Sequence, residues 1–157
     1  MREDNLEPFL SSDKIAERVA ALGEQISADL AAEELVVIGL LKGSFIFMAD
    51  LVRHITLPLQ IEFVRASSYG DQATSSGKVI MSIGAPFNLK DKHVLIVEDV
   101  LDTGLTLTRT LSTVRAQRPA SVRTAALLAK SSAPTEAREA IDYVGFEIGE
   151  EYIVGYG

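Results

Sequence analysis

Short apolar runs of strand length, separated by segments of helical periodicity, constrain the fold of this chain more than any other feature. The run LVVIGLL covers residues 35–41, and the run VLIV covers residues 94–97. Elsewhere the apolar residues recur at helical spacing, as Ile15, Val19 and Leu22 do. Alternating strands and helices predict an α/β domain with a mostly parallel central sheet flanked by helices.

The rest of the chain extends this alternation. Ser11 or Ser12 is expected to cap the first helix, which continues to Leu30. Further helices are predicted over residues 45–54 and 105–117, and extended segments over residues 35–41, 60–66, 78–84, 93–97, 121–129, 143–148 and 151–156. Residues 67–77, SSYGDQATSSG, have no periodicity and are predicted to form a long loop. Residues 130–140 are expected to form a connector with a helical turn.

Composition narrows the classes of function. The 157 residues suit one domain, 1–157, and they include no Cys, which excludes disulfides and thiolate metal sites. The only histidines, His54 and His93, are far apart, so a histidine zinc site is not expected. A net charge of −7 argues against general nucleic-acid binding. No apolar run suits a signal peptide or a membrane span, so we expect a soluble cytoplasmic protein.

Polar residues follow two of the predicted strands where each ends. Lys42 and Gly43 come after the 35–41 strand, and the segment 98–106 comes after the 93–97 strand. In an open parallel sheet, ligands bind beyond the carboxyl ends of the strands. We therefore expect these two loops to meet at one edge of the sheet and to form the ligand site there.

The segment 98–106 combines acids with a tight turn. Glu98 and Asp99 offer paired carboxylate oxygens, which suit the vicinal hydroxyls of a ribose, directly or through a metal ion. The turn 102–106, Asp-Thr-Gly-Leu-Thr, begins a helix whose first N–H groups are unused and favour an anion. Gly104 allows close approach, and the threonines add hydroxyl donors. Acids and threonines at strand ends are ordinary one by one, but together they predict a cradle for a sugar phosphate.

The segment VLIVEDVLDTGLTL (94–107) resembles the phosphoribosyl pyrophosphate (PRPP) signature of the type I phosphoribosyltransferases. Four further segments resemble the bacterial-type hypoxanthine-guanine branch of that family: LLKGSF (40–45), SSYG (67–70), LLAK (127–130) and DYVGFEIGEEYIVGYG (142–157). The similarity covers nearly the whole chain from Leu35. It implies the type I phosphoribosyltransferase fold, in which the chain ends build a small hood.

The resemblance also implies roles for single residues around PRPP. Glu98 and Asp99 would hold the ribose hydroxyls near Mg²⁺, directly or through water or the ribose, and Asp102 would be the acid/base group near N7 of the purine. The 5-phosphate would be held by Thr103, Gly104 and Thr106 with neighbouring backbone amides. Asp102 and Leu105 would also belong to the segment that binds PRPP. The pyrophosphate loop, in which the family has a cis peptide, would consist of Leu41, Lys42 and Gly43.

Other implied roles concern the base and the closing loop. Lys130 would bond the 6-oxo group, Tyr152 would stack on the purine, and the backbone of Ile153 would reach its edge. Ser68 and Tyr69 would belong to a flexible loop that closes over the reacting centre. Without the resemblance, Lys130 is equally a solvated strand-end charge, and Tyr152 is a sheet residue.

The implied activity is purine salvage, with transfer of the 5-phosphoribosyl group from PRPP to hypoxanthine or guanine. The products would be IMP or GMP and pyrophosphate. Two alternatives remain open at this point: a xanthine-preferring phosphoribosyltransferase, and a non-catalytic regulator that senses PRPP or a nucleotide. The family pattern implies a homodimer or homotetramer, small-molecule substrates, and no nucleic-acid or membrane partner. The family usually continues past the position of Gly157 with a metal-site Asp and a pyrophosphate-binding Arg, and we expect a longer C-terminal tail of this kind.

Overall fold

The computed structural model describes residues 6–31, 34–68, 78–82 and 87–156. Its centre is a six-stranded sheet with the order β3-β2-β1-β4-β5-β6. Strand β3 pairs with β2 in antiparallel fashion, and the other neighbours are parallel. The strands are β1 (Leu35–Leu41), β2 (Leu59–Ser68), β3 (Lys78–Ser82), β4 (His93–Leu101), β5 (Ser121–Lys130) and β6 (Tyr143–Ile148). The predicted α/β architecture is confirmed.

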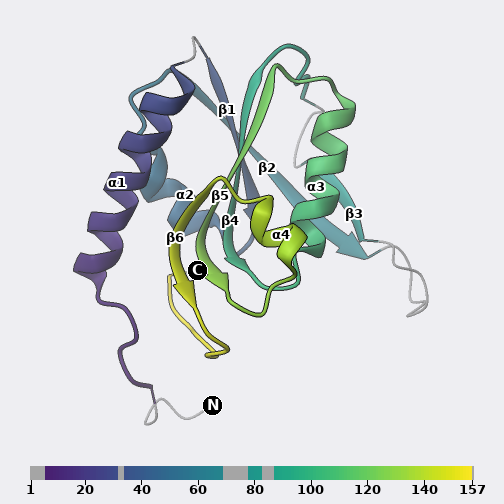
Figure 1. Cartoon of the computed structure of the whole chain (residues 1–157). Coiled ribbons are helices and arrows are strands. Elements are labelled where there is room, and N and C mark those ends of the chain that lie inside the picture. The colour runs from purple at the N-terminus through teal and green to yellow at the C-terminus, as the bar shows by residue number, and fades with distance from the viewer. Residues whose placement is uncertain (1–5, 32–33, 69–77, 83–86, 157) are drawn as a thin grey trace.

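Helices cover both faces of this sheet (Figure 1). They are α1 (Ser12–Leu30), α2 (Phe45–Val52), α3 (Leu105–Ala116) and α4 (Thr135–Glu139). Ser11 is the N-cap of α1, because its side chain accepts a hydrogen bond from the Lys14 amide at 3.3 Å. The short α4 is the helical turn expected in the connector after β5.

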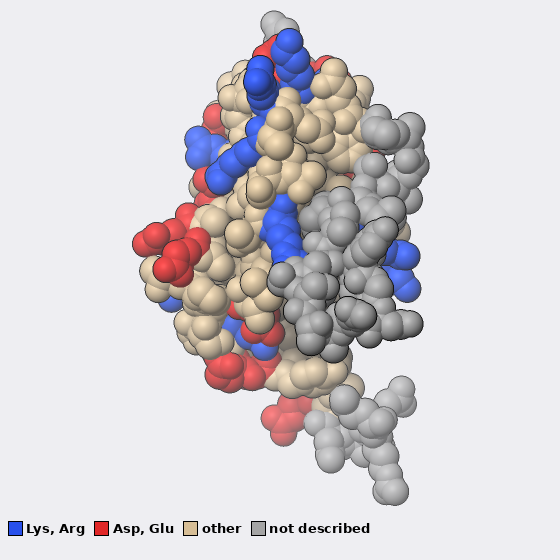
Figure 2. All heavy atoms as spheres, turned by 90° about the vertical axis from the view of Figure 1, so that its right-hand side faces the viewer, with Lys and Arg blue, Asp and Glu red and all other residues tan. Residues whose placement is uncertain are grey.

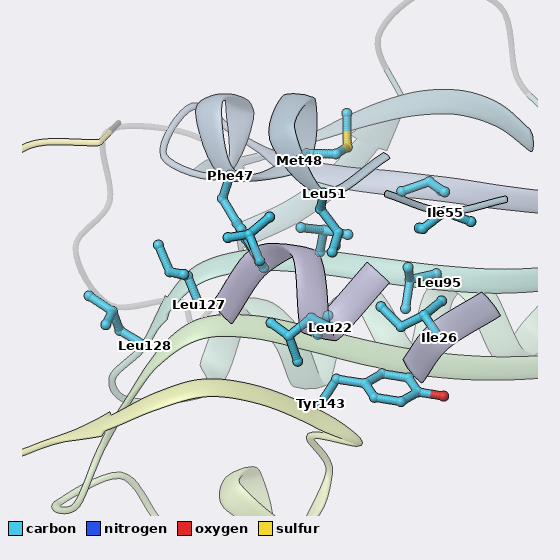
Figure 3. Close-up of a cluster of buried hydrophobic side chains, with 14 of the residues drawn as sticks. Leu22, Ile26, Phe47, Met48, Leu51, Ile55, Leu95, Leu127, Leu128 and Tyr143 are labelled. Carbon is cyan, nitrogen blue, oxygen red and sulfur yellow. The ribbon is translucent and has the colours of Figure 1, made fainter. Parts of the chain in front are cut away.

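Two apolar cores separate the layers. On one face, α1 and α2 pack on the sheet through residues that include Leu22, Ile26, Phe47 and Leu51 (Figure 3). On the other face, α3 and α4 pack on the sheet through residues that include Leu107, Leu111, Val114 and Ala137. Buried strands with apolar residues on both faces explain the continuous apolar runs in the sequence.

Strand β4 is longer than the sequence indicated. The apolar run ends at Val97, but pairing with β5 continues to Leu101, which lies opposite Ala129. Pairing with β1 stops at Val97, opposite Gly39. Glu98 and Asp99 therefore lie inside a strand that has lost one neighbour, rather than in a loop after it.

Segments near both ends of the chain pack on the core that includes β6, where the hood was expected. The guanidinium of Arg18 in α1 donates to the carbonyls of Val144 and Gly145 at 2.6 and 2.8 Å. Leu10 and Ile153 pack against the same apolar core. The extended segment predicted over 151–156 does not form a strand, because the chain turns where Gly155 and Tyr156 adopt positive φ angles of 101° and 57°.

Charged side chains of both signs lie on the face that carries α3 and β3 (Figure 2). At the end of the sheet where β4 and β5 begin, the backbones of Lys92 and Arg118 form hydrogen bonds with the neighbouring turns. Both residues therefore belong to that end of the sheet. This end lies opposite the carboxyl ends of the strands. Among the helices that the structure describes, none is long and apolar enough to cross a membrane.

Candidate active site

The strand register brings the predicted site residues to one edge of the sheet. Strands β1, β4 and β5 run parallel, and Gly39 lies opposite Val97 while Leu101 lies opposite Ala129. The residues that follow Gly39 therefore reach Asp99, and Asp102 reaches Lys130. The prediction that the two loops meet at the carboxyl edge is confirmed.

The loop after β1 contacts the acidic segment of β4. A cis peptide joins Leu41 to Lys42, as the family resemblance implied. The side chain of Lys42 is exposed, and Gly43 lies directly against the Asp99 carboxylate. A Cβ at Gly43 would come 2.0 Å from Oδ2 of Asp99, so any other residue here would displace the Asp99 carboxylate.

Glu98 has an uncompensated carboxylate oxygen. Its Oε2 is buried and has no hydrogen-bond partner among the described residues. Burial and, to a smaller extent, the neighbouring charge of Asp99 together raise the pKa of Glu98 to about 7. Such a group is poised to accept a donor or a cation that a ligand brings.

Asp102 and Lys130 form an ion pair across the ends of β4 and β5. The Lys130 Nζ donates to Oδ2 of Asp102 at 3.2 Å. The lysine side chain is 19% exposed and the aspartate side chain is 60% exposed, so the pair faces solvent on the aspartate side. These two residues are 28 positions apart in sequence, and the sheet register alone brings them into contact.

The turn from β4 into α3 has the left-handed geometry that a glycine suits. Gly104 has a φ of 74°, and its carbonyl accepts the first helical bond from the Thr108 amide at 2.9 Å. The Thr103 hydroxyl accepts from the Leu105 amide at 3.4 Å. Leu105 is 60% exposed at the start of α3, and the side chain of Thr106 is half-buried. The turn thus places backbone amides and hydroxyls at the helix N-terminus, where an anion is favoured.

Gly104 also has a packing role that the sequence did not suggest. A Cβ at Gly104 would come 2.4 Å from the Cβ of Ala137 in α4. The space beside Gly104 on that side is occupied by the protein itself. The sequence alone indicates only the close approach of a ligand as a reason for glycine at this position.

The C-terminal segment follows β6 along the same edge. Tyr152 is 78% exposed, so its ring is available at the surface, and Ile153 packs against the core. Ser68 is the last residue of β2. Tyr69 and the rest of the predicted flexible loop lie outside the described residues.

Two supporting residues were missed in the sequence. Ser44 is fully buried, and its hydroxyl donates to the Leu40 carbonyl at 2.7 Å, which braces the 41–43 loop. Asp50 in α2 accepts a hydrogen bond from the Tyr156 hydroxyl. A serine directly before a helix is a recognisable signal, but the Asp50 contact joins positions 106 apart and leaves no local signal.

Comparisons with known proteins agree with this geometry. A model of the phosphoribosyl transferase domain matches residues 6–157. The hypoxanthine phosphoribosyltransferase of Haemophilus influenzae is 42% identical over 160 residues, which cover 100% of this chain and 89% of that protein. The hypoxanthine-guanine phosphoribosyltransferase of Dictyostelium discoideum is 40% identical over 155 residues, which cover 96% of this chain and 86% of that protein.

A solved structure gives the same result. The hypoxanthine-guanine phosphoribosyltransferase from Bacillus anthracis superposes with a TM-score of 0.82 at 38% identity, covering 97% of this chain and 89% of that one. The family and fold predicted from the motifs are therefore confirmed. The chain belongs to the phosphoribosyl transferase domain family, and the relatives that it matches are hypoxanthine and hypoxanthine-guanine phosphoribosyltransferases.

Proposed function

We propose that this protein is a purine salvage enzyme that transfers the 5-phosphoribosyl group from PRPP to hypoxanthine or guanine. The products are IMP or GMP and pyrophosphate. Family membership supports the transferase activity. The single observation that supports the choice of base is the contact of Asp102 with Lys130 at 3.2 Å.

This pair matches one edge of a 6-oxopurine. The 6-oxo oxygen and N7 of guanine lie side by side on the same edge of the base. Lys130 is a donor for the oxygen, and Asp102 beside it exchanges a proton at N7. Two groups 3.2 Å apart can therefore contact neighbouring atoms of one ligand. Tyr152, with its exposed ring, covers the base by stacking, and the backbone of Ile153 reaches the edge of the base.

The other half of the site holds the sugar phosphate. Glu98 and Asp99 accept from the ribose hydroxyls. Residues 102–106 bind the 5-phosphate through the amides and hydroxyls of the helix N-terminus. Lys42 and the amides of the 41–43 loop bind the pyrophosphate that leaves. The contact of Gly43 with Asp99 keeps these two subsites adjacent.

The acidic pair also fits Mg²⁺. Among the described residues no three His, Cys, Asp or Glu side chains gather as metal ligands. Magnesium is usually held by one or two carboxylates together with substrate phosphates and water, so an acidic pair with one unpartnered oxygen suffices. Held there together with PRPP, the ion would supply positive charge to the pyrophosphate group.

Different residues of this chain take part in leaving-group stabilisation, in proton transfer and in the exclusion of water. As the C1–pyrophosphate bond breaks, Lys42 and the loop amides stabilise the leaving group. N9 of the purine bonds to C1, and Asp102 accepts the proton that the base loses at N7. Water must be kept from the sugar, which it would otherwise attack, and Ser68 at the end of β2 and Tyr69 after it are the residues that we propose for this role.

The test is an assay with PRPP, Mg²⁺ and each purine in turn, following nucleotide formation. Hypoxanthine, guanine or both should be converted, and xanthine is included because it shares the 6-oxo group. Asp102→Asn should lower kcat by roughly 10²–10⁴-fold, the usual effect of losing an acid/base group, with little change in the KM for PRPP.

The matched control is Asp91→Asn, which alters an exposed aspartate in the turn before β4 and should leave kcat unchanged. PRPP binding without turnover of any purine by the wild-type protein would favour a sensor of PRPP instead. Unchanged kcat in Asp102→Asn would remove Asp102 from the mechanism.

We further propose that the protein works as a homodimer or homotetramer in the cytoplasm, with small molecules as its only substrates. The number of subunits is measured by light scattering of the purified protein.

A further inference from the structure

A side-chain hydrogen bond ties the C-terminal segment to α2. The hydroxyl of Tyr156 donates to Oδ2 of Asp50, and both side chains are half-buried. Burial and the hydrogen bond to Asp50 both raise the pKa of Tyr156 well above its ordinary value. The phenol therefore stays protonated and remains a donor at neutral pH.

The backbone geometry aims Tyr156 at this contact. Gly155 and Tyr156 have φ angles of 101° and 57°, which turn the chain back toward the protein. The ring of Tyr156 packs against the same core as Ile153. The segment between Ile148 and Tyr156 is therefore fixed at both ends, by β6 and by Asp50.

Asp50, in turn, belongs to the same rigid unit as the 41–43 loop. Helix α2 begins at Phe45, whose amide donates to the Lys42 carbonyl at 3.2 Å. The hydroxyl of the buried Ser44 donates to the Leu40 carbonyl at 2.7 Å, and its own carbonyl accepts from the Met48 amide at 2.8 Å. The loop cannot move far without moving α2.

We propose that Tyr156 is a positioning residue, whose bond to Asp50 fixes the purine-contacting segment relative to the loop that holds pyrophosphate. The inference rests on the proposed function, in which Tyr152 and Ile153 contact the base. Because N9 of the base must meet C1 of the sugar as pyrophosphate leaves, the two segments must be held in one arrangement. Tyr156 acts through this arrangement and contacts no substrate.

The chain offers a matched control. The Tyr143 hydroxyl donates to Oδ2 of Asp29 at 3.1 Å, which ties β6 to α1. Tyr143→Phe and Tyr156→Phe each remove one phenol that bonds an aspartate and keep the ring. Only the second removal loosens the segment that carries Tyr152 and Ile153.

The experiment compares steady-state kinetics of wild type, Tyr156→Phe, Asp50→Ala, the double variant and Tyr143→Phe. Tyr156→Phe should raise the KM for the purine by about tenfold, the effect of losing roughly 1.4 kcal/mol. The KM for PRPP should stay within about twofold. The double variant should be no worse than the worse single variant, because both substitutions break the same bond. Tyr143→Phe should have the kinetics of the wild type.

Hydrogen exchange provides a second measurement that does not require turnover. Amides of residues 149–156 should exchange faster in Tyr156→Phe than in wild type, and those of β6 should not. Equal rises in both KM values, kinetics identical to those of Tyr143→Phe, or unchanged exchange in 149–156 would overturn the inference. Absence of 6-oxopurine turnover in the wild type would instead refute the proposed function, while the exchange experiment would still test the tether.

Discussion

The carboxyl group of Glu98 has an environment that couples its ionisation to folding. Its pKa rises from 4.5 to about 7 because it is buried beside Asp99. The folded state therefore holds a proton that the unfolded state releases between these two values. The stabilisation that this provides is complete below pH 4.5 and is lost as the pH rises through 7.

Glu98→Gln removes this titration. In metal-free buffer, the free energy of unfolding of Glu98→Gln, relative to that of the wild type, should increase by roughly 2–3 kcal/mol between pH 4.5 and pH 8. Urea denaturation at several pH values measures the difference. Glu24→Gln, at an exposed position of α1, is the control and should show no such trend. Parallel pH profiles for wild type and Glu98→Gln would contradict the assigned environment.

Under the proposed function, we expect Lys130 to determine which purines the site accepts. An ammonium group only donates, and adenine has an amino donor where hypoxanthine has an oxygen, so two donors would face each other. Sites of this kind reject mismatched analogues by up to roughly 10⁴–10⁵. We expect negligible turnover of adenine by the wild type. Lys130→Gln offers either a donor or an acceptor. It should reduce the difference in turnover between the 6-oxopurines and adenine, mainly by slowing turnover of the 6-oxopurines.

The values of kcat/KM for hypoxanthine, guanine and adenine in both proteins measure this effect. Lys92→Gln changes a lysine at the opposite end of the sheet and serves as the control. Comparable use of adenine and hypoxanthine by the wild type would show that Lys130 does not read the 6-position.

At the scale of elements, the junction of α3 with α4 depends on Gly104. Alanine there must adopt a φ of 74° and place its Cβ 2.4 Å from the Cβ of Ala137. The left-handed conformation costs a residue with a side chain about 1–2 kcal/mol, and the clash adds to this. Gly104→Ala should therefore lower the free energy of unfolding by roughly 2–4 kcal/mol, measured by urea denaturation.

Two further variants separate the cost of the left-handed conformation from the cost of the clash with Ala137. Gly155 has a φ of 101°, and no atom of the described residues lies within 4 Å of an added Cβ, so Gly155→Ala should lose only the conformational part. Adding Ala137→Gly to Gly104→Ala should recover the part due to the clash. A double variant as unstable as Gly104→Ala alone would show that the helices are not in contact there.

At the scale of the whole molecule, Arg18 joins the start of the chain to its end. Its two hydrogen bonds, at 2.6 and 2.8 Å, reach carbonyls more than 120 residues away, on the strand at the edge of the sheet. Arg18→Met should cost about 1.5–3 kcal/mol of unfolding free energy, since it leaves these half-buried carbonyls without their charged donor. Arg18→Lys should recover part of the loss.

Lys14→Met is the control, because Lys14 lies exposed on the same helix. Equal denaturation midpoints for the two methionine variants would mean that the Arg18 contacts do not stabilise the fold.

The sequence by itself determined the layers, the family and the candidate residues of the site. Continuous apolar runs of strand length favour strands that are buried on both faces, and the acids, glycine and threonines of 98–106 form one uninterrupted segment. These signals are local, so they can be recognised without knowing the fold. The extent of β4 was missed because polar Glu98 and Asp99 end the apolar run, although hydrogen bonding with β5 continues to Leu101.

Only the tertiary structure decided which distant residues meet. The contact of Asp102 with Lys130 depends on the register of β4 against β5, and the contact of Gly43 with Asp99 depends on the register of β1 against β4. Register is fixed by packing across the whole sheet and not by either segment alone. The same holds for the bond of Tyr156 to Asp50, which exists only because the C-terminal turn packs onto the core beside α2.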